Sequence, residues 1–231
     1  MITMGGYAEY VVLSNLIVNC QRYSWYWWGD GDPLYFMIEH LGERTGHPQP
    51  HEPPAGSIRN VSIRHVVAHG KGSCLITGYP TSWLDTISLE NIKFFLSTDP
   101  TAGYDKAIHA MQFRYARNLT MKDVEVIWEK PESAKWQSAL YFEDIGGLRL
   151  DSFLGGPAKA HPDTPVLLLD DVQDATIGNS KAQPGTQVFL KVKGAKSQGI
   201  YLVGNELHEA NTPYRSDPDV KEGAIMAVDN F

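Results

Sequence analysis

The chain has few cysteines and lacks long hydrophobic runs. Only Cys20 and Cys74 occur among 231 residues, and no cysteine or histidine cluster has the spacing of a zinc site. We expect two small buried thiols, with a disulfide between them as the alternative. No run reaches the roughly 18 apolar residues of a membrane span. The first six residues lack a basic stretch followed by an apolar one, so no signal peptide is visible.

The chain also lacks an excess of basic residues. Lysine and arginine number 20 against 27 acidic residues, which gives a formal net charge of −7. Without a basic stripe, nucleic acid and anionic membranes are not expected as partners, and polyanions such as unesterified pectin are disfavoured. No glycine-rich phosphate loop precedes a helix, and no serine lies in a nucleophile elbow, so we expect no cofactor.

A short apolar pattern recurs along the sequence: one apolar residue, any residue, an apolar residue, any two residues, and an apolar residue. From Ile63 onward, its middle apolar positions are 25 to 32 residues apart. Repeats of this length are typical of solenoids, in which extra residues form loops on one side. The middle positions are Leu13, Ile63, Leu89, Met121, Leu150, Ile177 and Leu202.

Each copy of the pattern alternates with period two, which predicts a short strand with one inward face. The pairs Arg64-His65 and Glu90-Asn91 break the alternation, and we expect them to turn the chain. Further strands are expected between the copies, and no segment carries a sustained helical period. These further strands are residues 73–77, 139–143, 166–170 and 187–192.

The pattern predicts an all-β fold: a single domain of residues 1–231 that forms a right-handed parallel β-helix of about seven coils. Residues 42–56 are expected to form an excursion loop and residues 211–222 a polar loop, followed by a last strand at 224–228. A β-sandwich is the alternative, but its hairpins would require tight turns such as Asn-Gly at regular intervals, and the sequence lacks them.

Several segments resemble a known family. The order of residues 16–18, 27–35 and 58–61, with the closing segments 185–190 and 199–207, resembles the later coils of family 28 glycoside hydrolases, the polygalacturonase-like β-helix proteins. The resemblance spans nearly the whole chain. It includes a tryptophan pair, a glycine and an acidic-proline step before a strand. It implies a β-helix fold and a plant cell-wall polysaccharide as ligand.

The chain departs from this family in its catalytic motifs. The family uses an Asn-x-Asp motif, an Asp-Asp pair, a Gly-His-Gly turn and an Arg-x-Lys motif on coils that precede the tryptophan segment. Here Asp170-Asp171 has no such partners, and Ala68-His69-Gly70 has alanine in place of the first glycine. No catalytic residue is therefore carried over from the resemblance.

Acidic residues outside the family motifs also form candidate carboxylate pairs. An inverting glycosidase needs two carboxyl groups roughly 6.5–9.5 Å apart. Stacked strands lie about 4.8 Å apart, so acidic residues on neighbouring coils can supply this spacing. Asp30 with Asp32, or Glu143 with Asp144, are the candidate pairs, and each pair also suits a solvated turn.

Aromatic residues give the densest chemical signal, since aromatic faces stack on sugar rings at little entropic cost. The segment 23–28 holds five aromatics, and one of them, Trp28, is expected in the core. Trp83 and Trp136 lie in turns and are expected on the surface, whereas the histidines are expected to be structural. The candidate carbohydrate-binding residues are Trp25, Tyr26, Trp27, Asp30, Asp32, Tyr35, Trp83 and Trp136.

These observations favour a non-catalytic carbohydrate-binding module for a plant cell-wall polysaccharide. The acidic net charge favours xylan or another neutral hemicellulose over pectin. Such a module is normally secreted and attached to a glycoside hydrolase catalytic domain. A shortened or divergent family 28 hydrolase is the alternative, and a purely structural β-helix is the third interpretation.

We predict that Trp25→Ala and Trp27→Ala abolish binding while the fold is kept, because each removes a stacking surface. Affinity electrophoresis on xylan, polygalacturonate, cellulose and mannan measures the binding. If both variants are retarded as strongly as the unmodified protein, the segment 23–28 is not part of the binding surface.

Overall fold

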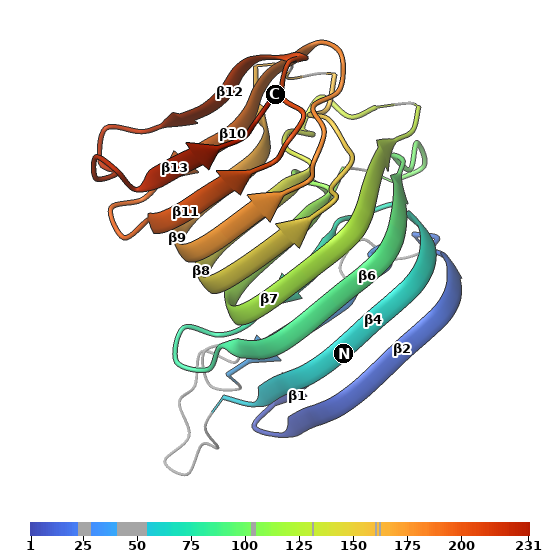
Figure 1. Ribbon diagram of the computed structural model, residues 1–231. Helices are drawn as coiled ribbons and strands as arrows, with labels where there is room; N and C mark the ends of the chain where they lie inside the picture. The colour runs from blue at the N-terminus through green and yellow to red at the C-terminus, as the bar shows by residue number, and fades with distance from the viewer. Residues whose placement is uncertain (23–28, 41–54, 103–104, 131, 160, 162) are drawn as a thin grey trace.

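The computed structural model describes residues 1–22, 29–40, 55–102, 105–130, 132–159, 161 and 163–231 (Figure 1). All regular elements in this part of the chain are β-strands, so the all-β prediction is confirmed. The same residues contain no helix that is long and apolar enough to cross a membrane.

The strands stack in two rows, and every strand-to-strand ladder is parallel (Figure 1). This stacking is the arrangement expected of a β-solenoid. The first row consists of β2 (Tyr7–Asn19), β4 (Ser57–Gly70), β6 (Leu84–Leu96), β7 (Met111–Trp128), β8 (Leu140–Asp151), β9 (Pro165–Gly178), β11 (Gln198–Val203) and β13 (Ile225–Val228).

The second row contains the expected additional strands. Strands β7, β8 and β9 belong to both rows, because each is long enough to turn a corner and pair in both. The remaining strands of this row are β1 (Ile2–Met4), β3 (Tyr35–Glu39), β5 (Cys74–Thr77), β10 (Thr186–Lys193) and β12 (Ala210–Ser216).

The register confirms the sequence repeat. Leu13 pairs with Ile63, Ile63 with Leu89, and Leu89 with Met121. The same column continues through Leu150, Ile177 and Leu202. Like positions of successive repeats are therefore stacked directly, and the inward apolar side chains form continuous columns through the core.

One corner of every coil uses a left-handed backbone conformation. Arg64-His65 and Glu90-Asn91 were expected to turn the chain, and both His65 and Asn91 have positive φ. This conformation is uncommon outside glycine but is tolerated best by Asn and Asp. The residues stacked at this corner are Asn15, His65, Asn91, Asp123, Ser152, Asn179, Gly204 and Asp229.

The core is built from stacked apolar columns, with aromatic pairs such as Phe113 and Phe142, whose ring centroids are 5.1 Å apart. Trp136 belongs to this core: it is 0% exposed and packs against Trp128 at 5.2 Å. The expected surface position of Trp136 is therefore wrong. Burying the large apolar indole in the core stabilises the fold, and a side chain without exposed surface cannot stack on a sugar.

The predicted loops differ in part from the structure. Residues 211–216 are part of β12, so the predicted polar loop at 211–222 is partly wrong; main-chain pairing with β10 does not need apolar side chains. The predicted last strand is confirmed as β13. The predicted loop at 42–56 lies, up to residue 54, outside the described residues.

Cys20 and Cys74 are free thiols, and burial raises the pKa of both.

A buried polar ladder crosses the last coils. Asn205 is fully buried; its side-chain oxygen accepts from the Ser180 backbone N–H at 2.9 Å, and its side-chain nitrogen donates to the Ile177 carbonyl at 2.9 Å. The same nitrogen donates to Asn230 Oδ1 at 2.8 Å. These bonds satisfy backbone groups that the corner leaves without strand partners.

We predict that Asn205→Ala lowers the free energy of unfolding by about 2–4 kcal/mol, because two buried backbone groups lose their partners. Urea denaturation followed by circular dichroism measures the change. Asn211→Ala is the control, since the exposed Asn211 bonds only to the Gln187 side chain among the described contacts and should cost less than about 0.5 kcal/mol. Equal losses in the two variants would contradict the role of the ladder.

Candidate functional site

A hollow of about 500 Å³ lies where β4, β6 and β7 approach the turn that precedes β6. We call it the Trp83 hollow, after a predicted carbohydrate-binding residue that lines it. Its lining residues are Ser57, Ile58, Arg59, Pro80, Thr81, Ser82, Trp83, Asp85 and Arg117.

The turn before β6 fixes the position of Trp83. Tyr79 and Ser82 exchange two backbone hydrogen bonds, of 2.9 and 2.8 Å. The indole nitrogen of Trp83 donates to the Pro80 carbonyl at 3.2 Å, and its ring lies 6.4 Å from the Tyr115 ring. Gly78 is required here, since a Cβ would lie 2.2 Å from the Tyr115 carbonyl oxygen. The hydrogen bond to Pro80 and the contact with Tyr115 thus fix the orientation of the indole.

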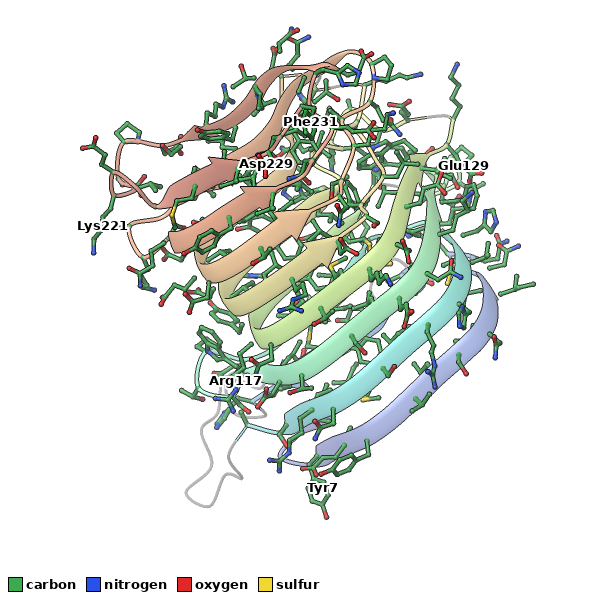
Figure 2. All side chains as sticks on the ribbon, viewed as in Figure 1. Tyr7, Arg117, Glu129, Lys221, Asp229 and Phe231 are labelled. Atoms are coloured by element: carbon green, nitrogen blue, oxygen red, sulfur yellow. The ribbon has the colours of Figure 1, made fainter. Side chains whose placement is uncertain are left out.

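The floor of the hollow is a charged column across neighbouring strands. Arg59 pairs with Glu9, and Arg117 Nη2 lies 2.9 Å from Asp85 Oδ2. Arg117 lies within β7, beside the start of β6 (Figure 2). Burial acts to raise the pKa of Asp85, but hydrogen bonds from Asn118, Thr86 and Arg117 outweigh it, so the pKa lies below its ordinary value. Asp85 is therefore an ionised acceptor at neutral pH.

The hollow combines an aromatic wall with planar charged groups and hydroxyls. An indole face offers a stacking surface to an apolar ring face, while guanidinium N–H groups and a carboxylate bind hydroxyl groups in defined directions. Within the described residues, no group of three or more metal-ligating side chains lies close enough to hold an ion. The hollow is thus suited to bind an uncharged polyhydroxylated ligand.

Asp30 and Asp32 were expected to accept hydrogen bonds from sugar hydroxyls, and the structure contradicts this for Asp32. Asp32 is only 6% exposed and forms an ion pair of 2.7 Å with Lys106. Asp30 lies 3.8 Å from the Arg22 guanidinium. Burial raises the pKa of Asp32, although the bond from Lys106 opposes this effect. The turn faces inward because the Lys71 and Gly72 N–H groups both bind the Gly31 carbonyl.

The other predicted residues divide into two groups. Tyr35 is half-buried at the start of β3, its hydroxyl lies 3.5 Å from Met37 Sδ, and burial, with Glu39 and Asp32, raises its pKa to about 12. Trp25, Tyr26 and Trp27 lie outside the described residues. Of the predicted residues that the structure describes, Trp83 alone lines the hollow.

The charged residues of the hollow were not predicted from the sequence. Arg59, Asp85 and Arg117 are far apart in the chain, and only the strand register places them in one column. A sequence signal for them exists, because each lies two residues before the first apolar residue of its repeat, and a residue with positive φ (Asn60, Thr86 or Asn118) follows it directly.

A second polar cluster, which we call the Tyr141 row, lies on the other row of strands. Arg114, Glu143, Asp170 and Lys193 are stacked in one column. The Tyr141 hydroxyl lies 2.9 Å from Glu143 Oε2 and 3.2 Å from Asp170 Oδ2. Burial, followed by Glu143, raises the pKa of Tyr141 well above its ordinary value.

The Tyr141 row corrects one candidate pair. Glu143 was expected to be paired with Asp144, but its neighbour is Asp170 of the next strand. Asp144 occupies a corner with φ of 50°, and its carboxylate lies 3.3 Å from Lys196. Consecutive residues of a strand point to opposite sides, so the neighbour on the same face comes from the adjacent strand.

His109 packs beneath this row. Its ring stacks on Tyr141 at 4.8 Å, and its Nδ1 accepts from the Ser138 backbone N–H at 3.3 Å, so the bonded nitrogen carries no proton. Burial, together with the charge of Lys193, lowers the pKa of His109 to about 4. His109 is a neutral structural residue, as expected for the histidines.

No protein-family model, curated protein or solved structure matches the chain. The resemblance to family 28 glycoside hydrolases therefore stays a prediction.

We predict that His109 makes the protein less stable as pH falls from about 6.5 to about 4. In this window the unfolded chain binds a proton that the folded protein excludes, so folding is opposed by up to about 3 kcal/mol at the acidic end. Urea denaturation at several pH values measures the effect. His109→Gln should flatten the slope, whereas the exposed control His208→Gln should keep it. An unchanged slope in His109→Gln would exclude this assignment.

Proposed function

We propose that the two rows of parallel strands form a right-handed β-helix of about seven coils, as the repeat predicts. A connection that returns to a parallel neighbour in the same sheet is right-handed in nearly all proteins. The direct stacking of seven repeat positions, from Leu13 to Leu202, supports the coil number.

We further propose that the chain is a non-catalytic carbohydrate-binding module for a neutral plant cell-wall polysaccharide, with xylan or another hemicellulose as the ligand. The Trp83 hollow carries this proposal, because it joins a fixed indole to guanidinium, carboxylate and hydroxyl groups. Such sites are few on a protein, and polar groups placed around an aromatic surface orient the ligand.

The charges of the hollow favour a neutral sugar over a uronic acid. Arg59 is paired with Glu9 and Arg117 with Asp85, so neither guanidinium is left to balance a ligand carboxylate. The formal net charge of −7 also repels a polyanion at low salt. A role in cell-wall degradation would place the protein outside the cell, attached to a glycoside hydrolase catalytic domain.

A glycoside hydrolase remains the second candidate, and the Tyr141 row supports it. Glu143 and Asp170 stand side by side with one hydroxyl between them, and hydrolysis of glycosides uses two carboxyl groups. Each carboxylate is also paired with a cation, Arg114 or Lys193, as expected of a structural column. This pairing favours the structural role.

We predict that the protein is retarded on xylan and that Trp83→Ala weakens binding at least about tenfold, because aromatic anchors commonly contribute 2 kcal/mol or more. Affinity electrophoresis on xylan, mannan, cellulose and polygalacturonate measures this. Tyr214→Ala is the matched control, since Tyr214 is an exposed aromatic of β12 and should leave binding unchanged.

Release of reducing sugar, measured in parallel, separates the two candidates. Binding without product supports the module. Steady product release that is lost in Glu143→Gln or Asp170→Asn would establish the hydrolase instead. If no glycan retards the protein and none is cleaved, both candidates are wrong, and a purely structural role of the β-helix is favoured.

A further inference from the structure

A second hollow, of about 330 Å³, lies across β6, β7, β8 and β9. We call it the Arg149 hollow, after the arginine that lines it. Most of its other lining side chains are polar and exposed, and three of them are threonines. Its lining residues are Thr86, Asn118, Leu119, Thr120, Gly147, Leu148, Arg149, Asp174 and Thr176.

The register of the strands explains the shape of the Arg149 hollow. Arg149 lies in an outward column between Thr120 and Thr176 of the neighbouring strands. The residue two positions before each of these three lies at a left-handed corner. Before Arg149 this corner residue is Gly147, with φ of 80°, which has no side chain. The corner column therefore has a gap at Gly147, and the gap forms part of the hollow.

The Arg149 hollow borders the Trp83 hollow. Asp85 lines the Trp83 hollow, and its carboxylate accepts a hydrogen bond of 2.9 Å from Asn118 Nδ2, which belongs to the Arg149 hollow. The indole reaches the same border, because a Cβ on Gly146 would lie 3.7 Å from Trp83 Cζ3, and Gly147 follows Gly146 directly. A ligand that lies on the indole is therefore beside the Arg149 hollow.

The two hollows together are too long for one sugar ring. They cross neighbouring strands from β4 through β6, β7 and β8 to β9 (Figure 1). Adjacent strands are about 4.8 Å apart, so these four steps correspond to about 19 Å. A single ring cannot contact both ends of this surface at once, whereas a chain of linked sugars can.

The Arg149 hollow offers hydrogen-bonding groups that the protein leaves available. Arg149 and Asp174 are exposed, and neither forms an ion pair within the described part of the chain. A guanidinium donates hydrogen bonds, a carboxylate accepts them, and the threonine hydroxyls do both, so each can bind a sugar hydroxyl. One cation and one anion leave the lining without net charge, which suits a neutral ligand.

We propose that the Arg149 hollow is a second sugar subsite, into which the polysaccharide chain that stacks on Trp83 continues across β8 to β9. The inference rests on the proposed carbohydrate-binding function and specifies its ligand: an extended neutral chain, not a monosaccharide or a disaccharide. Trp83 supplies the stacking surface, and Arg149 with Asp174 binds the hydroxyl groups of sugars farther along the chain.

NMR titration of the intact protein with xylobiose and xylohexaose tests the proposal, since it measures weak affinities as well as strong ones. Xylohexaose should bind at least about tenfold more tightly than xylobiose, because only the longer chain reaches the charged groups of the Arg149 hollow. Arg149→Ala should remove this advantage and leave the affinity for xylobiose unchanged. Arg64→Ala is the matched control, because Arg64 is an exposed arginine of β4 that lines neither hollow.

The outcomes separate this inference from the proposed function. If xylohexaose binds and Arg149→Ala binds it as tightly as Arg64→Ala, the Arg149 hollow is not a subsite, while the binding module stands. Equal affinities of the unmodified protein for the two oligosaccharides overturn the inference in the same way. So does an equal loss of both affinities in Arg149→Ala, because the subsite is reached only by the longer chain. If neither oligosaccharide binds, the proposed xylan ligand is wrong, and the inference fails with it.

Discussion

The direct stacking of equivalent positions on parallel strands is the constraint on which the rest of the structure depends. Because each inward residue has its equivalent immediately above and below, one apolar column serves all coils, and a shift by one residue would expose the whole column. The left-handed corner supports this register, since Asn91 bonds to His65 and Asn179 bonds to Asp151, each on the neighbouring strand. Stability is therefore shared between adjacent coils instead of residing in one central core.

The same stacking governs the charges on the outside. Glu9, Arg59, Asp85 and Arg117 alternate in sign along one column, so each is neutralised by the strand beside it. The Tyr141 row departs from this alternation, since Glu143 and Asp170 are adjacent, and a tyrosine hydroxyl and two cations compensate. The Trp83 hollow, by contrast, lies where alternating charges meet a turn that carries an aromatic ring.

The sequence predicts the repeating part of the fold well, because apolar spacing reports directly on which residues face inward. The strands around Ile63, Leu89 and Met121, and the corner at His65, follow from that spacing alone. The sequence predicts side-chain exposure in turns poorly. Trp83 and Trp136 occur in similar turn contexts, yet one lines a hollow and the other is buried against Trp128. Partners across coils, such as Lys106 with Asp32, are separated by many residues and become visible only in three dimensions.

The turn that holds Trp83 has a consequence for how such proteins diversify. The turn joins β5 to β6, and both strands are held in place by pairing with neighbouring strands. The turn contributes the Trp83 indole, which lies outside the stacked columns of the core. Residues can be exchanged or inserted there while the coils beneath keep their spacing, as the unequal repeat lengths already illustrate. Substitutions in this short connection can therefore change the lining of the Trp83 hollow while the stacked coils keep their register.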